Sequence, residues 1–248
     1  MMLVLDDVSL GYPEQSIVTH LSFSLEAGQI CAVIGHNGAG KSSLIRTLLG
    51  LQPPLAGTLN WKGGEPRNIA YLGQSAELDN QFPIRVKDVV SMGIWQGLDF
   101  WTGLDKAGSD KVAEALERTG LTHMADRPLY ECSSGQLQRC FFARAIVQDA
   151  PLLLLDEPFS AIDQTTEAGL IEIIRQWRTE GRAVMIVIHD LSTAMAVSDS
   201  CLLLGGGRAC FGKTTDILNT DNLLSYHYLS ETQAEFLSLL QSSGGSNV

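Results

Sequence analysis

The sequence predicts an α/β fold with a mainly parallel core sheet, an antiparallel β subdomain and an inserted α-helical subdomain, on three observations. After Pro151, short apolar strands alternate with helical patterns, as they do in parallel sheets that helices cover on both faces. Near the N-terminus, residues 3–9 and 17–25 alternate apolar and polar side chains, which is typical of half-buried antiparallel strands. From about 76 to 148 helical periodicity dominates, so a helical block interrupts the core.

The individual elements follow from the same patterns. The segment Gly11-Tyr12-Pro13 separates the two N-terminal strands. The other strands are predicted from short apolar runs at 29–34, 57–61, 69–72, 152–155, 183–188 and 201–204. The helices are predicted from helical periodicity at 41–50, 86–92, 110–120, 136–148, 164–180 and 191–197.

Composition and charge narrow the class of function. Of the 248 residues 45% are hydrophobic and 18% are charged, which is enough apolar material for a globular core. No apolar run approaches the roughly 20 residues of a membrane-spanning helix, and the N-terminus carries acid where a signal peptide carries base. We therefore expect any membrane role to come through a partner. The net charge of −11 argues against nucleic acid as a partner.

The cysteines and histidines predict neither disulfides nor a site for a metal cargo. The five cysteines include no C-x-x-C pair, which is typical of reduced thiols in a cytoplasmic protein. The five histidines are scattered, and none is spaced with cysteines as zinc ligands are.

A phosphate-binding loop is the first motif that carries chemistry. Residues 35–42, Gly-His-Asn-Gly-Ala-Gly-Lys-Ser, fit G-x-x-x-x-G-K-[ST] between a predicted strand and a predicted helix, which indicates a P-loop NTPase (RecA-like) core. The glycines let several backbone N–H groups face one anion, and the helix adds its positive end. We expect Lys41 to reach the β- and γ-phosphates of ATP and the Ser42 hydroxyl to ligate Mg²⁺. The expected nucleotide contacts are Gly35, Asn37, Gly38, Ala39, Gly40, Lys41, Ser42 and Ser43.

Two carboxylates end the apolar strand 152–155. Buried strands do not carry acids at their ends unless those acids have a partner or a task. We expect Asp156 to hold Mg²⁺, directly or through water. Glu157 is expected to orient and activate the attacking water as a general base.

Three further features stand in a fixed order along the chain. Gln74 follows the strand 69–72, Ser133-Ser134-Gly135-Gln136 opens a helix, and His189-Asp190 follows the strand 183–188. Together with the phosphate loop, the acidic pair and the segment 160–163, this set resembles the ABC ATPase family over about residues 3–212. The resemblance implies one ABC ATPase domain over 1–248, with a core at about 1–75 and 149–230 and a helical subdomain at about 76–148. The composition of the final residues, Ser-Ser-Gly-Gly-Ser-Asn-Val, separately predicts a disordered tail at 242–248.

The resemblance assigns a role to each matching position. Tyr12 would stack on adenine, the alternative being a turn aromatic that simply packs. Gln74 would touch Mg²⁺ or the water and sense the γ-phosphate; alternatively it is an ordinary loop amide. His189 would bond the γ-phosphate and steady Glu157, unless it is a packed core histidine.

The same resemblance implies that two copies of the chain complete each other's sites. The signature segment, Ser133, Ser134, Gly135 and Gln136, would face the γ-phosphate of ATP held by a second copy, in an ATP-sandwich dimer. Asp163 would cross the dimer interface and support the opposite site.

The signature segment departs from the family's usual Leu-Ser-Gly-Gly-Gln at two positions. Ser134 replaces a glycine, which would strain the backbone if that position needs a positive φ and would be harmless if it only begins a helix. Cys132 replaces a leucine and is expected to pack as a small hydrophobe. The alternative is a thiol whose pKa is lowered by the helix N-terminus, so that its alkylation would block dimer closure.

The segment 79–93 looks like the Phe-Pro-x-x-Val-x-Asp-Val-Val-x-Met-Gly segment of ATPases from zinc and manganese importers. The stretches 97–101 and 145–150 also look like that subfamily. This likeness implies an ATPase that energises uptake of a divalent metal ion, zinc before manganese. Its partners would be an integral membrane permease and, indirectly, a periplasmic metal-binding protein, with the chain cytoplasmic and peripheral on the inner face of the cell membrane.

Other functions stay open from the sequence. Importers of iron chelates or cobalamin share much of the segment 79–93. A soluble ABC ATPase, such as one that supports iron–sulfur cluster assembly, is a second alternative. A regulatory module that binds ATP without hydrolysis is a third, although the presence of both Glu157 and His189 argues against it.

Overall fold

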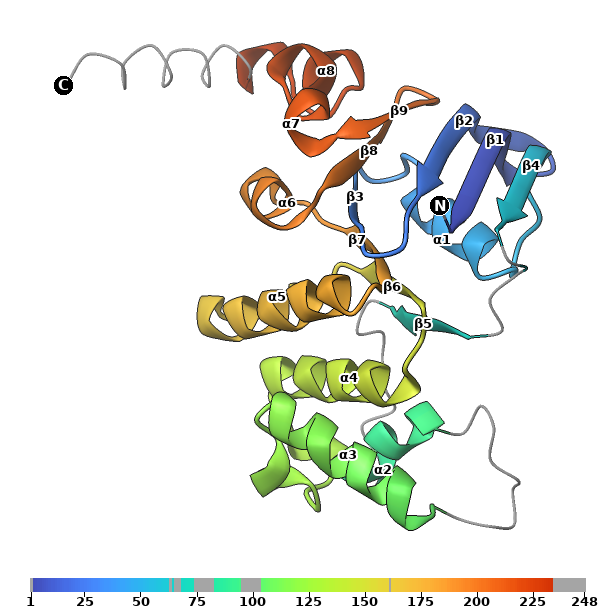
Figure 1. The fold of residues 1–248 in the computed structure, drawn as a ribbon. Helices are drawn as coiled ribbons and strands as arrows, with labels where there is room; N and C mark the ends of the chain where they lie inside the picture. Colours follow the sequence, from blue (N-terminus) through green and yellow to red (C-terminus); the bar gives the residue numbers. More distant parts are fainter. Residues whose placement is uncertain are drawn as a thin grey trace, which may run out of the picture. The chain divides into compact units, whose positions relative to one another are not determined.

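The structure is a computed structural model that describes residues 2–62, 64, 68–73, 83–94, 104–160 and 162–233. The helices and strands are labelled in Figure 1, and the chain divides into two compact units. Unit 1 comprises residues 1–26, 31–65 and 188–248, and unit 2 comprises 27–30 and 66–187. The predicted tail at 242–248 lies outside the described residues, and the predicted subdomain boundaries near 76 and 148 remain a prediction.

The predicted antiparallel subdomain is present in unit 1. It is a three-stranded sheet of order β2-β1-β4, formed by β1 (Leu3–Tyr12), β2 (Gln15–Leu25) and β4 (Ala56–Trp61). Strand β1 continues through Gly11, where the sequence predicted a break. A Cβ at Gly11 would lie 2.3 Å from the Gln15 carbonyl oxygen, so glycine here serves close strand packing.

Unit 1 also holds a second group of strands. Strand β3 (Ile30–Gly35), of which all but the first residue belong to this unit, runs parallel to β8 (Ser200–Gly205), and β9 (Arg208–Lys213) pairs antiparallel with β8. Every residue of β3 and β8 is buried. The helices are α1 (Lys41–Leu48), α6 (Leu191–Val197), α7 (Thr214–Ile217) and α8 (Thr220–Ser225).

Three parallel strands form the sheet of unit 2. They are β5 (Ile69–Leu72), β6 (Leu152–Asp156) and β7 (Ala183–Val187), with β6 paired to both neighbours. Helix α5 (Gln164–Thr179) buries Trp177, whose ring stacks on Phe142 with the centroids 5.5 Å apart. The parallel arrangement predicted from the apolar runs is therefore confirmed within each unit.

The inserted helices also belong to unit 2. They are α2 (Val86–Ser91), the 3₁₀ turn η1 (Met92–Ile94), α3 (Lys106–Arg118), the turns η2 (Thr122–Met124) and η3 (Leu129–Glu131), and α4 (Ser134–Gln148). Helix α3 begins earlier than its periodicity predicted, and α4 begins in the signature segment that was predicted to open a helix, because capping side chains start both. Asp105 accepts from the Gly108 backbone N–H at 2.7 Å, and Ser133 caps α4 in the same way.

In the part of the chain that the structure describes, no helix is long and apolar enough to cross a membrane.

Candidate nucleotide-binding and hydrolysis site

The backbone of the phosphate loop connects β3 to α1 within unit 1. Gly38 and Gly40 have positive φ values of 83° and 104°, which only glycine adopts without strain. Gly40 is also the N-cap of α1, and a Cβ there would lie 2.6 Å from the Val18 Cγ2 methyl. The glycine spacing therefore serves both the backbone turn and the packing of the loop against β2.

Lys41 is held inside this loop. Its residue is only 8% exposed, and its Nζ donates to the carbonyl oxygens of Gly35 at 2.7 Å and His36 at 3.1 Å. The neighbouring Ser42 is exposed, whereas Ser43 is buried. A buried ammonium beside the N-terminus of α1 favours an anion, so the loop has the chemistry that a triphosphate requires.

Tyr12 lies at the end of β1 and is 48% exposed. Its hydroxyl accepts a hydrogen bond from the Arg46 Nη1 at 3.1 Å. The hydrogen bond anchors the hydroxyl end of the Tyr12 ring. The ring is more exposed than an aromatic side chain that packs in the core. The position is compatible with stacking on a flat ligand.

The acidic pair follows strand β6 in unit 2. Asp156 is the last residue of β6, and both Asp156 and Glu157 are partly buried. Glu157 has a φ of 52°, a left-handed conformation that costs a non-glycine residue about 1–2 kcal/mol. Its backbone N–H donates to the Val187 carbonyl at 3.2 Å and its carbonyl accepts from Ser160 at 3.1 Å. Backbone strain of this kind is concentrated at functional sites.

The signature segment caps its own helix. The Ser133 Oγ accepts from the Gln136 backbone N–H at 3.3 Å, and the Gln136 Oε1 accepts from the Ser133 backbone N–H at 2.9 Å. Ser134 is the first residue of α4 and does not have a positive φ. The replacement of glycine by serine at this position therefore strains nothing.

Asp163 lies beside the signature segment within unit 2. A Cβ at Gly135 would be 3.4 Å from the Thr166 Oγ1 and 3.7 Å from the Asp163 Oδ2. Asp163 caps α5 and accepts from the backbone N–H and the hydroxyl of Thr166 at 2.9 and 2.8 Å. These hydrogen bonds hold the pKa of the Asp163 carboxyl below its ordinary value, so the carboxylate is ionised at neutral pH.

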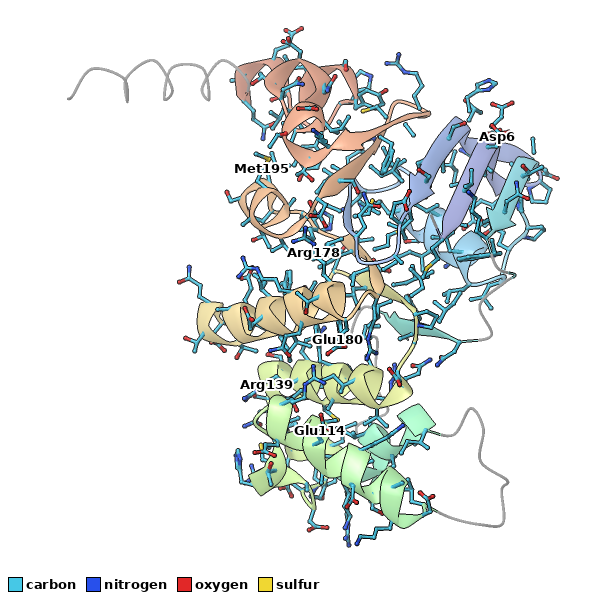
Figure 2. All side chains as sticks on the ribbon, viewed as in Figure 1. Asp6, Glu114, Arg139, Arg178, Glu180 and Met195 are labelled. Atoms are coloured by element: carbon cyan, nitrogen blue, oxygen red, sulfur yellow. The ribbon has the colours of Figure 1, made fainter. Side chains whose placement is uncertain are left out.

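Arg139 is a polar residue near the signature segment to which the sequence assigned no role. It is labelled in Figure 2 and lines a pocket of about 170 Å³ with Arg118, Thr166 and Gly169. It is partly buried, and its Nε has no hydrogen-bond partner among the residues that the structure describes. A buried donor without a partner is costly, so an acceptor supplied from outside would be stabilising here.

His189 follows β7 and belongs to unit 1. It is exposed, so the alternative of a packed core histidine is wrong. The preceding Ile188 N–H donates to the Val33 carbonyl at 3.3 Å, and the following Asp190 caps α6 by accepting from the Thr193 N–H at 2.6 Å. The His189 carbonyl accepts a hydrogen bond from the Tyr228 hydroxyl, a contact that no motif in the sequence indicates.

The predictions for Cys132 and Gln74 have different outcomes. Burial raises the pKa of the Cys132 thiol, and the Pro128 carbonyl lies 3.9 Å from its sulfur. The alternative of a thiol with a lowered pKa is therefore wrong, because desolvation outweighs the charge of Arg127. Gln74 lies outside the described residues.

A family model with the description ABC transporter matches residues 18–160, more than half of the chain. The chain belongs to this family. It is an ATP-binding domain of the ABC transporter family and an ATPase.

Named members of ABC transport systems align with most of the chain. It is 34% identical over 223 residues to the manganese transport system ATP-binding protein MntB of Bacillus subtilis, covering 88% of this chain and 89% of MntB. It is 37% identical over 203 residues to the zinc transport system ATP-binding protein TroB of Treponema pallidum, covering 80% and 76%. It is 36% identical over 209 residues to the chelated iron transport system membrane protein YfeB of Yersinia pestis, covering 82% and 71%.

Solved structures share the fold. An inward-facing ABC transporter assigned to the metal-chelate type matches with a TM-score of 0.83 at 29% identity, covering 92% of this chain and 89% of that chain. The predicted α/β P-loop NTPase fold of an ABC ATPase is therefore confirmed.

Proposed function

We propose that this ABC ATPase energises the uptake of a divalent metal ion through a separate membrane permease, with zinc as the first candidate cargo and manganese as the second. The observation that carries the proposal is the similarity to ATP-binding proteins of manganese and zinc transport systems over at least 80% of the chain. The zinc- and manganese-type segment at 79–93 supports it. A periplasmic metal-binding protein would deliver the ion, and the chain would act on the cytoplasmic face of the cell membrane.

Nucleotide binding is assigned to the phosphate loop. Lys41 bonds the β- and γ-phosphates, with its side chain already directed by the loop carbonyls of Gly35 and His36. The backbone N–H groups from Gly38 to Ser43 cradle the phosphate oxygens, and Tyr12 stacks on the adenine.

Magnesium fits the oxygen-rich donor set of Ser42, Gln74 and Asp156, because hydroxyl, amide and carboxylate oxygens are the ligands that it prefers. When bound, the ion neutralises charge that develops on the phosphates. Ser42 is exposed at the start of α1, and Asp156 is partly buried at the end of β6.

Hydrolysis is assigned to Glu157 and His189. Glu157 orients the attacking water and takes its proton, and its left-handed backbone sets the direction of its side chain. His189, exposed between β7 and α6, bonds the γ-phosphate and steadies Glu157.

A second copy of the chain completes each site in the proposed ATP-sandwich dimer. The signature segment would bond the γ-phosphate held by the other copy, exchanging part of its own capping for phosphate contacts. Asp163, ionised and next to Gly135, would support the opposite site. The unpartnered Nε of Arg139 adds a reason for an acceptor to approach this face of unit 2.

Transport by the reconstituted complex tests the proposal. The chain and its permease are placed in proteoliposomes with ATP inside and the binding protein outside, and uptake of radioactive zinc, manganese and a ferric chelate is measured separately. We expect ATP-dependent zinc uptake above manganese uptake, no ferric chelate uptake, and loss of all uptake in Lys41→Ala. Uptake of the ferric chelate alone would contradict the metal-ion proposal.

The iron-chelate importer is the second candidate, because the relative YfeB is as similar to this chain as the zinc and manganese proteins are. The ferric chelate arm of the same experiment distinguishes it. If the chain hydrolyses ATP but never co-purifies with a permease, the soluble ABC ATPase is favoured instead.

A further inference from the structure

The backbone around His189 is anchored from three different elements of unit 1. Strand β3 holds Ile188 through the Val33 carbonyl, at an N···O distance of 3.3 Å. The N-cap of α6 holds Asp190, whose carboxylate accepts from Thr193 at 2.6 Å. The carbonyl of His189 itself accepts a hydrogen bond from Tyr228, which lies 39 residues further along the chain.

Tyr228 belongs to a short segment, the C-terminal turn (residues 226–229), that is itself firmly held. The N–H groups of Tyr228 and Leu229 both donate to the Leu223 carbonyl, at 2.8 and 3.0 Å. His227 has a φ of 56°, which turns the chain after α8. The backbone of the turn packs so closely on β8 that a Cβ at Gly205 would lie 1.8 Å from the Tyr226 carbonyl oxygen.

The side chain of Tyr228 is suited to act as a lasting donor. Burial raises the pKa of its hydroxyl, and the charge of Asp190 raises it further, so the proton stays on the oxygen at neutral pH. The bond fixes the peptide plane between His189 and Asp190. Fixing that plane restricts the backbone from which the His189 Cβ and imidazole project, on a residue that is otherwise exposed.

We propose that Tyr228 is a positioning residue for ATP hydrolysis, which holds the His189 backbone so that the imidazole is presented in one orientation. The inference rests on the role assigned to His189 under the proposed function. It predicts that the C-terminal turn, distant in sequence from every nucleotide-binding motif, acts on turnover and leaves nucleotide binding unchanged. The turn does this through one hydroxyl group.

The test compares two tyrosines of the same turn. Tyr228→Phe removes the hydroxyl that bonds His189, whereas Tyr226→Phe removes one that bonds the Cys210 thiol and leaves its ring beside Arg208. In the full-length chain with its permease, we expect Tyr228→Phe to lower kcat by about threefold to tenfold, as the loss of one hydrogen bond does, with an unchanged KM for ATP. Tyr226→Phe is expected to leave both constants at the parental values.

A second readout separates positioning from general destabilisation. In NMR spectra of labelled histidine, the imidazole signal of His189 is expected to shift or broaden in Tyr228→Phe and to stay unchanged in Tyr226→Phe. A parental kcat and a parental His189 signal in Tyr228→Phe would overturn the inference. So would equal losses of kcat and of thermal stability in both variants, because the turn would then matter only for folding.

His189→Ala, measured beside these variants, keeps this inference distinct from the proposed function. If His189→Ala turns over as fast as the parent, the role assigned to His189 fails, and the inference falls with it. If His189→Ala is inactive while Tyr228→Phe is fully active, only the positioning role of Tyr228 fails.

Discussion

The phosphate loop of unit 1 and the signature segment of unit 2 both lie at helix N-termini, yet they are built in different ways. The phosphate loop uses glycines with positive φ and a buried lysine, so its anion-binding groups depend on backbone shape. The signature segment has no positive φ and uses side chains, with Ser133 and Gln136 capping each other. A loop of the first kind is preformed for phosphate, whereas one of the second kind satisfies its own donors, which in the proposed dimer a partner's phosphate would replace.

The largest expected effect tests whether both regions act on one nucleotide. Glu157→Gln removes the proposed general base without changing the shape of the side chain, so ATP hydrolysis is expected to fall by roughly 100-fold to 10,000-fold. ATP binding is expected to persist, and the uncleaved nucleotide to hold two copies together, as size-exclusion chromatography with light scattering would detect. Hydrolysis at the parental rate would show that Glu157 is not the general base. A variant that stays monomeric in saturating ATP would contradict the proposal that the two regions bind the same nucleotide.

The next effect tests the claim that backbone shape governs the phosphate loop. At Gly40 the φ is 104° and an added Cβ would lie 2.6 Å from the Val18 side chain, so Gly40→Ala introduces both backbone strain and a steric clash. Gly38→Ala introduces backbone strain alone, because its Cβ would meet no atom within 4 Å. We expect Gly40→Ala to weaken ATP affinity by well over tenfold, and Gly38→Ala by about tenfold, since strain of 1–2 kcal/mol corresponds to that ratio. Isothermal titration calorimetry measures both, and equal affinities in the two variants would refute the packing argument.

A smaller effect tests the side-chain capping of the signature segment. Ser133→Ala removes the cap of α4 and is expected to cost about 1 kcal/mol of folding free energy, and to lower ATPase activity through the proposed phosphate contact. Ser134→Gly is the matched control on the neighbouring exposed residue, and it is expected to cost only about 0.5 kcal/mol and to leave activity unchanged. Urea unfolding and steady-state ATPase assays measure these effects. A more active Ser134→Gly would show that glycine is needed there after all.

The smallest effect concerns pH and Asp163, whose pKa is lowered by its hydrogen bonds to Thr166. Because the folded-state pKa lies below the unfolded value, the stabilisation is present above the ordinary value of 3.8 and is lost as pH falls through the folded-state value. Asp163→Asn keeps an oxygen that can accept the Thr166 N–H but does not titrate. It is therefore expected to leave the neutral side of the melting-temperature profile nearly unchanged and to make the fall on the acid side slightly less steep. An unaltered acid limb would contradict the lowered pKa.

The sequence predicted most of the fold because its signals are local. Apolar runs located β5 without error and the other predicted strands to within three residues at either end, and glycine spacing located the phosphate loop. Strand β9 and the helices α7 and α8 were missed, since they are short and partly exposed and carry little periodic pattern. Helix α3 began earlier than predicted because Asp105 caps it, and capping depends on side-chain geometry as well as residue type. The start of α4 agrees with the signature segment 133–136, which was predicted to open a helix.

The sequence by itself determined the family and predicted a nucleotide site in a loop of glycines and a lysine, because that motif is made by consecutive residues. Only the tertiary structure decided that Ser134 is unstrained, that burial raises the pKa of Cys132, that Asp163 lies beside Gly135, and that Tyr228 holds the carbonyl of His189. Each of these depends on backbone conformation or on groups brought together by packing, and a one-dimensional pattern carries no distances between such groups.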